Sequence, residues 1–314
     1  MLQSTVFNLE AHIESIKPEL KPPVGNKMIF GNKESVKFMC VGGPNARPDY
    51  HLEEGEELFY QLKGHMDLWI EEQGVRRGVR IEEGEMFLLP AHVPHSPQRY
   101  ADTIGLVWER ERGPDERDAL RWYIDEDFES SDLSLLWEEY FHCFDLGVQL
   151  KPAITRYLES ECKRTRVPPA GIPVPNPPTV VDKEVKVPKP FLLGPALAAL
   201  PGADVGAPQA LLLGEFEVMV YRSCTDAALS GRQGSKEVFL FSSPANGGEP
   251  AVGTDAASST VICGEDRYTV GPGDALYLTV PDGVDLRVVD QGANAMLLSV
   301  HNKNYFPVPE GQNK

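Results

Sequence analysis

The 314-residue sequence lacks the features that mark membrane, secreted and nucleic-acid-binding proteins. No apolar run approaches the ~18 residues of a membrane span and the N-terminus has no signal-peptide layout, so we expect a soluble protein of the cytosol. The five cysteines are odd in number and form no C-x-x-C pair, which argues against disulfides and a thiolate zinc site. A net charge of −17, from 47 acidic and 30 basic side chains, argues against nucleic acid as a partner.

Histidine is also scarce, and its distribution separates two halves of the chain. Six of the seven histidines precede residue 143, and only His301 lies in the second half. Between the halves, residues 167–190 contain eight prolines and can sustain neither a helix nor a central strand. We therefore expect a catalytic domain at 1–164, a proline-rich linker at 165–190 and a second domain at 191–314. Chemistry that needs imidazole must lie in the first domain.

Both halves contain short β-type runs separated by glycine-containing turns, which predicts a chain dominated by β-structure. Two similar antiparallel barrels or sandwiches are the simplest arrangement. Apolar residues at i, i+3 and i+4 predict that residues 131–161, after the first barrel, are mainly helical. The β-type runs are Ser35–Val41, Glu57–Leu62, Met66–Glu71, Arg77–Ile81, Met86–Leu89 and Thr103–Arg110, then Ala210–Arg222, Lys236–Ser242, Ser259–Cys263, Asp266–Val270, Ala275–Val280 and Ala295–Val300.

Two segments of the first half carry a set of metal-binding residue types. They read GPNARPDYHLEEGEELFYQLKG and GEMFLLPAHVPHSPQR, and they contain His51, Glu57 and His95. His51 and Glu57 are six residues apart, an even separation that favours one face of a β-ribbon, although a glycine between them could turn the chain. Two imidazoles and one carboxylate can occupy one face of a metal ion and leave its other positions open, as in non-haem Fe(II) sites.

The spacings resemble the two motifs of cupins, small barrels of the double-stranded β-helix or jelly-roll type. In the first motif, G-x5-H-x-H-x3,4-E-x6-G, His51 takes the first histidine position, Glu57 fits the carboxylate, and Glu53 stands where the second histidine is usual. The second motif, G-x5-P-x-G-x2-H-x3-N, places His95 at its histidine and His92 where glycine is usual.

The match is closer to one family. The two segments, with PPVGNKMIFG upstream and TIGLVWERER downstream, resemble the 3-hydroxyanthranilate 3,4-dioxygenase family over roughly residues 5–165. Bacterial members are single cupins with a C-terminal pair of C-x-x-C motifs, so this chain is similar to the animal-type form, with two cupins in one chain. The resemblance implies an iron enzyme that opens the ring of 3-hydroxyanthranilate with O2. The product, 2-amino-3-carboxymuconate 6-semialdehyde, belongs to the kynurenine pathway of tryptophan catabolism, which leads to quinolinate and to pyridine nucleotide (NAD) biosynthesis.

The resemblance also implies a role for each site residue. The three motif side chains would hold one Fe(II) per chain, with O2 as co-substrate. Arg99 would bind the substrate carboxylate, for which a planar guanidinium is suited, and Glu109 and the ligand Glu57 would also contact the substrate. Arg47 would lie beside the O2 position. Arg47, Glu57, Arg99 and Glu109 are thus the expected catalytic residues. Three further side chains are expected in the pocket wall, namely Asn26, Phe59 and Pro97.

Other polar residues of the chain have simpler interpretations. Glu53, Glu54 and Glu56 are expected to form a solvated acidic turn, although Glu53 at the missing-histidine position could be a fourth ligand. His92 is expected to be structural, with a hydrogen-bond donor to the ligands as the alternative. Surface ion pairs are expected for Arg76, Arg77, Arg110, Glu111 and Arg112, and ordinary hydrogen-bonded roles for His12, His65, His142 and His301.

The second half retains little of the ligand set. Glu237 aligns with the carboxylate position, whereas Leu286 and Gly231 occupy the two histidine positions. We therefore expect a degenerate, metal-free cupin that covers apolar surface of the first barrel as a dimer partner would. This arrangement favours a monomer.

Two other classes of function stay open. The first is another metal-dependent cupin enzyme, such as a sugar isomerase or a thiol dioxygenase; the latter usually has three histidines, so Glu57 argues against it. The second is a non-catalytic ligand-binding or storage cupin, which would bind no iron or bind it without turnover. Two arginines and a glutamate grouped around a complete ligand set argue against storage.

Overall fold

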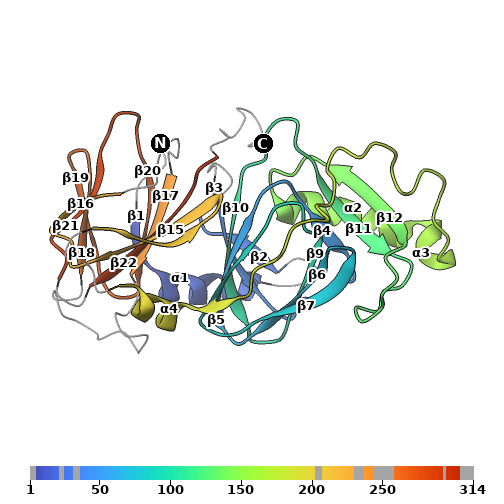
Figure 1. The fold of residues 1–314 in the computed structure, drawn as a ribbon, viewed down its shortest axis with the longest axis horizontal. Helices are drawn as coiled ribbons and strands as arrows, with labels where there is room; N and C mark the ends of the chain where they lie inside the picture. Colours follow the sequence, from blue (N-terminus) through green and yellow to red (C-terminus); the bar gives the residue numbers. More distant parts are fainter. Residues whose placement is uncertain are drawn as a thin grey trace. The chain divides into compact units, whose positions relative to one another are not determined.

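The described part of the computed structural model consists of two compact units, each built on a pair of antiparallel sheets (Figure 1). The first unit, the first barrel, runs from Lys17 to Phe191, and the second unit, the second barrel, contains the described residues from Leu192 onward together with the N-terminal residues up to Ile16. The expected β-dominated fold with two barrels is confirmed. The described residues are 5–20, 25–30, 36–201, 207–229, 237–242, 258–292 and 295–304.

The first barrel contains two six-stranded sheets. Its strands are β2 (Asn26–Met28), β3 (Val36–Gly42), β4 (Tyr50–Leu52), β5 (Glu57–Lys63), β6 (Met66–Glu72), β7 (Val75–Ile81), β8 (Glu85–Leu89), β9 (His95–Arg99), β10 (Ile104–Arg110), β11 (Asp118–Tyr123), β12 (Leu135–Phe141) and β13 (Phe191–Leu192). One sheet has the order β13-β8-β5-β10-β3-β2, and the other has the order β12-β11-β4-β9-β6-β7. The sheet order shows that strands far apart in sequence are paired.

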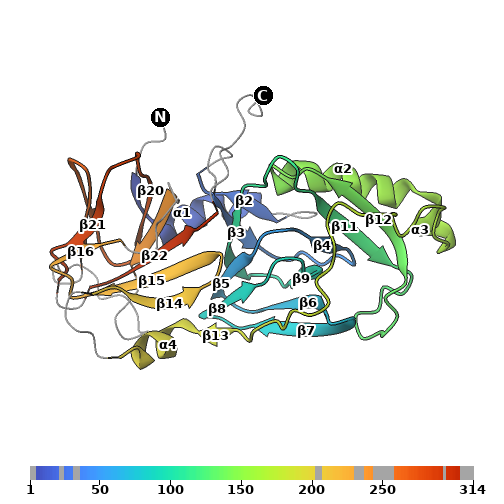
Figure 2. The same ribbon diagram turned by 45° about the horizontal axis from the view of Figure 1, so that its top comes forward.

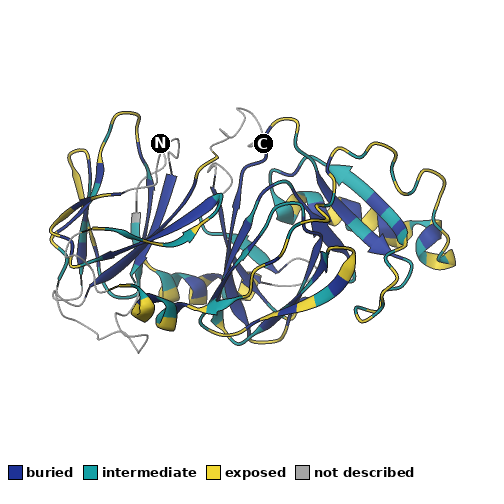
Figure 3. Ribbon diagram, viewed as in Figure 1, coloured by how far each residue is buried: buried dark blue, intermediate teal, exposed yellow. Residues whose placement is uncertain are grey.

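The core of the first barrel lies between these two sheets. Along β6, alternate residues Met66, Leu68 and Ile70 are buried, as the two-residue period of a strand requires. They belong to one core cluster with Phe59 of β5 and Phe87 of β8, which come from the other sheet. Figure 3 shows the buried positions concentrated in the strands. Full burial of each such side chain stabilises the fold by roughly 1.5–3 kcal/mol, which makes the barrel a firm support for the residues at its mouth.

Two helices of the first unit follow β12, namely α2 (Leu146–Glu159) and α3 (Glu161–Thr165), and α2 lies along β11 and β12 (Figure 2). The prediction that residues 131–161 are mainly helical is wrong for their first part, because Leu135–Phe141 forms β12 and pairs with β11. Apolar residues there also fit a two-residue period, and pairing to an open sheet edge decided between the two. Trp122 of β11 stacks on Tyr157 of α2, with ring centroids 4.2 Å apart. No helix among the described residues is long and apolar enough to span a membrane.

The proline-rich segment is part of the first barrel and not a free spacer. Val187 is buried in the barrel core, and the backbone N–H of Asp182 donates to the carbonyl of His92 at 3.0 Å. The Nδ1 atom of His92 lies 3.1 Å from the carbonyl oxygen of Val180. The segment therefore packs on the turn that precedes His95.

The second barrel contains β1 (Thr5–Asn8), β14 (Gln209–Leu213), β15 (Phe216–Arg222), β16 (Asp226–Ala228), β17 (Glu237–Ser242), β18 (Ser259–Cys263), β19 (Asp266–Val270), β20 (Asp274–Thr279), β21 (Leu286–Val289) and β22 (Met296–Asn302), with helices α1 (Leu9–Ile16) and α4 (Leu193–Ala199). Its sheets have the orders β1-β20-β17-β22-β15-β14 and β16-β21-β18-β19. Because β1 pairs with β20, residues 5–16 belong to the second barrel, which differs from the expected catalytic domain of residues 1–164. Some positions used in the sequence analysis lie outside the described residues, namely Ser35, Gly231, Lys236 and positions 22–24 and 31 of the PPVGNKMIFG segment.

Candidate metal centre

Three strands bring His51, Glu57 and His95 together inside the first barrel. His51 in β4 is directly opposite His95 in β9 within one sheet, whereas Glu57 begins β5 in the other sheet. The two ligand candidates at positions 51 and 57 therefore do not share one face of a ribbon, because the intervening turn carries the chain between sheets. They face each other across the barrel interior, and all three side chains are buried.

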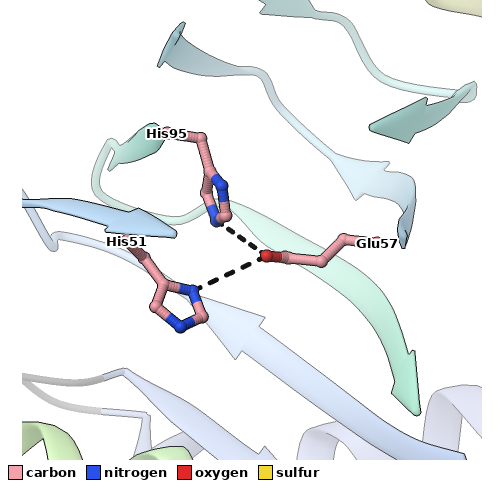
Figure 4. A group of neighbouring side chains, drawn as sticks. All are labelled: His51, Glu57 and His95. Atoms are coloured by element: carbon pink, nitrogen blue, oxygen red, sulfur yellow. Dashed lines mark ion pairs between the residues drawn. The ribbon is translucent and has the colours of Figure 1, made fainter. Parts of the chain in front are cut away.

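The three side chains converge on one point (Figure 4). Oε1 of Glu57 lies 2.7 Å from Nε2 of His95 and 3.7 Å from Nδ1 of His51. One ligand atom from each of the three residues lies within 4.8 Å of the others, which is compatible with a shared metal ion.

Neighbouring acceptors assign the ring protons of both histidines. Nε2 of His51 lies 2.8 Å from Oδ2 of Asp118, and Nδ1 of His95 lies 3.0 Å from the carbonyl oxygen of Val93. A carboxylate and a carbonyl oxygen only accept hydrogen bonds, so these two nitrogens carry protons. When the rings are neutral, the remaining nitrogens, Nδ1 of His51 and Nε2 of His95, face the Glu57 carboxylate with their lone pairs.

This donor set fits a metal cation. Two imidazole lone pairs and a carboxylate oxygen repel one another unless a proton or a metal ion lies among them. Burial lowers the pKa of His51, but the hydrogen bonds and charges of Asp118 and Glu57 raise it more, to about 9. Burial raises the pKa of Glu57, but His95 and His51 hold it well below its usual range. The site thus attracts positive charge.

Arg112 is buried and binds the carboxylates that neighbour the candidate ligands. Arg112 donates from Nε and Nη2 to the two carboxylate oxygens of Asp118, at 3.0 and 2.8 Å, and from Nη1 to Glu109 at 2.8 Å. Its Nη2 also lies 2.6 Å from Glu53. Burial lowers the pKa of Arg112, but its three carboxylate partners raise it further, so the guanidinium stays charged.

A cavity with about 540 Å³ of empty space, its open mouth included, opens onto the candidate ligands. All nine residues proposed from the sequence line it, namely Asn26, Arg47, His51, Glu57, Phe59, His95, Pro97, Arg99 and Glu109. Seven further residues line it that the sequence analysis did not single out, namely Gly25, Met39, Val41, Asn45, Val107, Leu146 and Leu150. Leu146 and Leu150 belong to α2, so this helix contributes an apolar wall that no motif spacing could reveal.

The polar end of the cavity carries two arginines and a glutamate. Arg99 at the end of β9 is buried, which lowers its pKa to about 10 despite the charge of Glu57. Ser96 and Gln98 donate to the carbonyl oxygen of Arg47 at 3.0 and 2.9 Å and so fix the loop that bears it. Burial, opposed by the charge of Arg112, raises the pKa of Glu109 to about 7.

Several residues assigned to the surface by the sequence analysis are buried. Arg110, Glu111 and Arg112 are at most 4% exposed, and Arg76 is 9% exposed, so the prediction of surface ion pairs is wrong for them. Arg110 ends β10, an inner strand of its sheet, and Glu111 directly follows it. Inside the protein, Arg110 pairs with Glu116 and Glu111 pairs with Lys37.

The acidic turn also differs from its expected solvated form. Glu53 is 3% exposed and is bound to Arg112; it does not line the cavity. It still lies in a second group, Glu53, Glu57 and Glu109, whose oxygens lie within 4.8 Å of one another. His92 has a φ of 63°, which explains why glycine is usual at this motif position. Both groups that could hold a metal ion, within the described part of the chain, lie in the first barrel.

Asp118 and Arg112 are the site residues that sequence reasoning missed. Asp118 is fully buried at the start of β11, 67 residues from His51. The available signal was a charged residue at the head of the apolar stretch DALRWY, which alone does not reveal its partner.

Comparison with known proteins gives a consistent result for the first half of the chain. The family model described as 3-hydroxyanthranilic acid dioxygenase matches residues 1–158. The 3-hydroxyanthranilate 3,4-dioxygenase of Rattus norvegicus is 50% identical over 160 residues, which are 51% of this chain and 54% of the relative. Those of Homo sapiens and Xenopus tropicalis are 47% and 46% identical, over 54% and 59% of this chain and 55% and 63% of theirs. The chain thus matches about half the length of these relatives.

Among solved structures, a cupin 2 conserved barrel domain protein from Leptotrichia buccalis overlaps with a TM-score of 0.45 and 10% identity, covering 95% of this chain and 96% of that one.

The fold and the site define the class of the protein. It is a protein of two antiparallel β-barrels, and its first barrel contains an interior candidate ligand set of two histidines and a carboxylate that lines an arginine-containing cavity. The family model matches half of the chain, so the chain belongs to the 3-hydroxyanthranilic acid dioxygenase family.

Proposed function

We propose that the protein is an Fe(II)-dependent ring-opening dioxygenase that converts 3-hydroxyanthranilate and O2 to 2-amino-3-carboxymuconate 6-semialdehyde. One observation carries the proposal: the family match covers the same segment whose candidate ligands, two arginines and glutamate line one cavity. By this proposal the protein serves the kynurenine pathway in the cytosol and supplies the precursor of quinolinate and NAD.

We assign the metal to His51, Glu57 and His95, with one ion per chain. When bound, Fe(II) would supply open coordination positions for the substrate and O2 and a path for electrons from ring to oxygen. The three lone-pair donors described above support this assignment, because they need a cation between them.

The remaining cavity residues would bind and orient the substrate. Arg99, buried and cationic, is suited to a bidentate contact with the substrate carboxylate, which excludes water from that end of the cavity. Glu109, whose pKa of about 7 lets it exchange a proton near neutral pH, would take the proton of the substrate hydroxyl. Arg47 would lie beside the O2 position. Phe59, Pro97 and Asn26 would form the wall against the ring.

We propose that the second barrel binds no metal. Glu237 is buried there, but Leu286 takes a histidine position and is part of the apolar surroundings of the barrel core. A metal content of one ion per chain, measured on purified protein by atomic emission, is expected; two ions per chain would contradict this assignment. A monomer is expected in analytical ultracentrifugation.

The function is tested by reconstitution without oxygen. The purified protein is loaded with Fe(II), mixed with 3-hydroxyanthranilate and exposed to air, while O2 uptake and the transient absorbance of the semialdehyde are followed. Both signals are expected from the wild type and neither from Glu57→Gln, whereas Glu56→Gln, which changes a neighbouring glutamate outside the cavity lining, should retain both. Iron-loaded wild type that gives neither signal would refute the proposal and favour a ligand-binding cupin.

A further inference from the structure

The buried guanidinium of Arg112 connects both ends of the candidate site. The Nε and Nη2 atoms of Arg112 donate two hydrogen bonds to Asp118, and Nη1 donates one to Glu109. Arg112 is 4% exposed, and Asp118 and Glu109 are 0% and 2% exposed. Charges so deeply buried persist only in well-satisfied networks, so their geometry is fixed rather than adjustable.

Asp118 is the member of this network that touches a candidate ligand. Its Oδ2 accepts from Nε2 of His51 at 2.8 Å while it also accepts from Arg112. Such a carboxylate–histidine contact sets which ring nitrogen carries the proton and how the ring is turned.

We propose that Asp118 and Arg112 are positioning residues of the metal centre. Arg112 holds the Asp118 carboxylate, Asp118 keeps the His51 proton on Nε2, and Nδ1 of His51 is thereby presented to the ion. Through its third nitrogen, Arg112 also keeps Glu109 at the cavity wall. The proposal rests on the proposed function only in requiring that a metal binds at His51, Glu57 and His95.

The hydrogen-bond inventory predicts what an asparagine does at position 118. Both carboxylate oxygens of Asp118 face donors: Oδ1 faces Nε of Arg112, and Oδ2 faces both Nη2 of Arg112 and Nε2 of His51. The NH2 group of an asparagine would therefore meet either Arg112 or the His51 proton. Relief of the second clash moves that proton to Nδ1, where it blocks the metal.

The test compares two carboxylate-to-amide variants. Glu116 is a matched control because its carboxylate also accepts two hydrogen bonds from one arginine, from Nη1 and Nη2 of Arg110 at 2.5 and 2.8 Å. Glu116 does not line the cavity. Affinity for Co²⁺ is measured by chelator competition, and the visible absorption of the bound Co²⁺ reports its ligand geometry. Asp118→Asn is expected to weaken Co²⁺ binding by about 10- to 100-fold and to change the spectrum, and Glu116→Gln to stay within about twofold with an unchanged spectrum.

Equal affinities and spectra for the wild type and Asp118→Asn would overturn the proposal. If Asp118→Asn is unfolded without metal, Arg112→Lys replaces it, because lysine keeps the charge but lacks the fork. Arg112→Lys is expected to weaken Co²⁺ binding and, through Glu109, the binding of 3-hydroxyanthranilate; retention of wild-type Co²⁺ affinity would overturn the role of Arg112. These readouts need no turnover. If the wild type binds Co²⁺ but does not open the ring when it is loaded with Fe(II), the proposed function is refuted and this comparison stays valid.

Discussion

Metal binding at the candidate centre is expected to release a proton from His51. In the metal-free protein the pKa of His51 is about 9, because Asp118 and Glu57 together outweigh the effect of burial. At pH 7 the ring therefore carries protons on both nitrogens, and Nδ1 must lose its proton before it can bind an ion. The perturbation to apply is a change of pH during metal titration.

The size of the effect on the apparent metal affinity follows from the difference between the pH and the pKa of His51. Each pH unit below about 9 weakens the apparent metal affinity about tenfold, so the penalty at pH 7 is roughly 100-fold, or about 2.7 kcal/mol. The stability of the metal-free protein changes with pH in the opposite direction to the metal affinity. Because the folded pKa of His51 is raised above its ordinary value of 6.5, its stabilisation of the metal-free protein is complete below pH 6.5 and is lost as pH rises through about 9.

Calorimetric titration with Mn²⁺ in two buffers of different ionisation enthalpy measures the protons released. About one proton per ion is expected from His51 at pH 7, falling as the pH passes 9. Glu109, with a pKa of about 7, adds to the signal, so Asp118→Asn serves to isolate the histidine part: it should release less at pH 8. An affinity that is constant from pH 6.5 to 8.5, with no proton released, would refute the reasoning.

Three further predictions concern the cavity and its support. Arg99→Ala should raise KM for 3-hydroxyanthranilate at least about 100-fold with iron content unchanged, because two charge-assisted hydrogen bonds of at least ~1.5 kcal/mol each are lost; loss of iron in this variant would contradict the assignment. Trp122→Ala should lower the free energy of urea unfolding by about 3–5 kcal/mol, since the ring is buried and stacks on Tyr157; a change below 1 kcal/mol would speak against that packing. Gly43→Ala should destabilise the fold by about 2 kcal/mol and weaken substrate binding, because a Cβ would lie 1.9 Å from the backbone oxygen of Tyr100; an unchanged urea midpoint would disprove this.

Local patterns in the sequence were sufficient for the fold class and, together with the family resemblance, for the charged residues of the cavity. Alternation and turn spacing predict strands because the two-residue period of a strand is a local property, and most of the expected strands lie within a few residues of those observed. The spacing of His51, Glu57 and His95 predicted the candidate ligands for a related reason, because the lengths of the turns between strands decide which side chains meet.

Local patterns failed where two structures fit the same spacing. The apolar residues of Leu135–Phe141 satisfy a helical and a strand period alike, and the free edge of β11 made the strand more favourable. Charge was misleading in the same way: Arg110, Glu111 and Arg112 look like a solvated run, yet they lie in and directly after a strand at the centre of a sheet.

The sequence by itself determined that two imidazoles and a carboxylate, residue types that can bind a cation, occur at cupin spacing. Only the tertiary structure decided which distant groups support them. Asp118 reaches His51 across 67 residues, and β1 pairs with β20 from the opposite end of the chain. Such partners are chosen by sheet order and by the need to pair every buried charge, and neither is a property of a short segment.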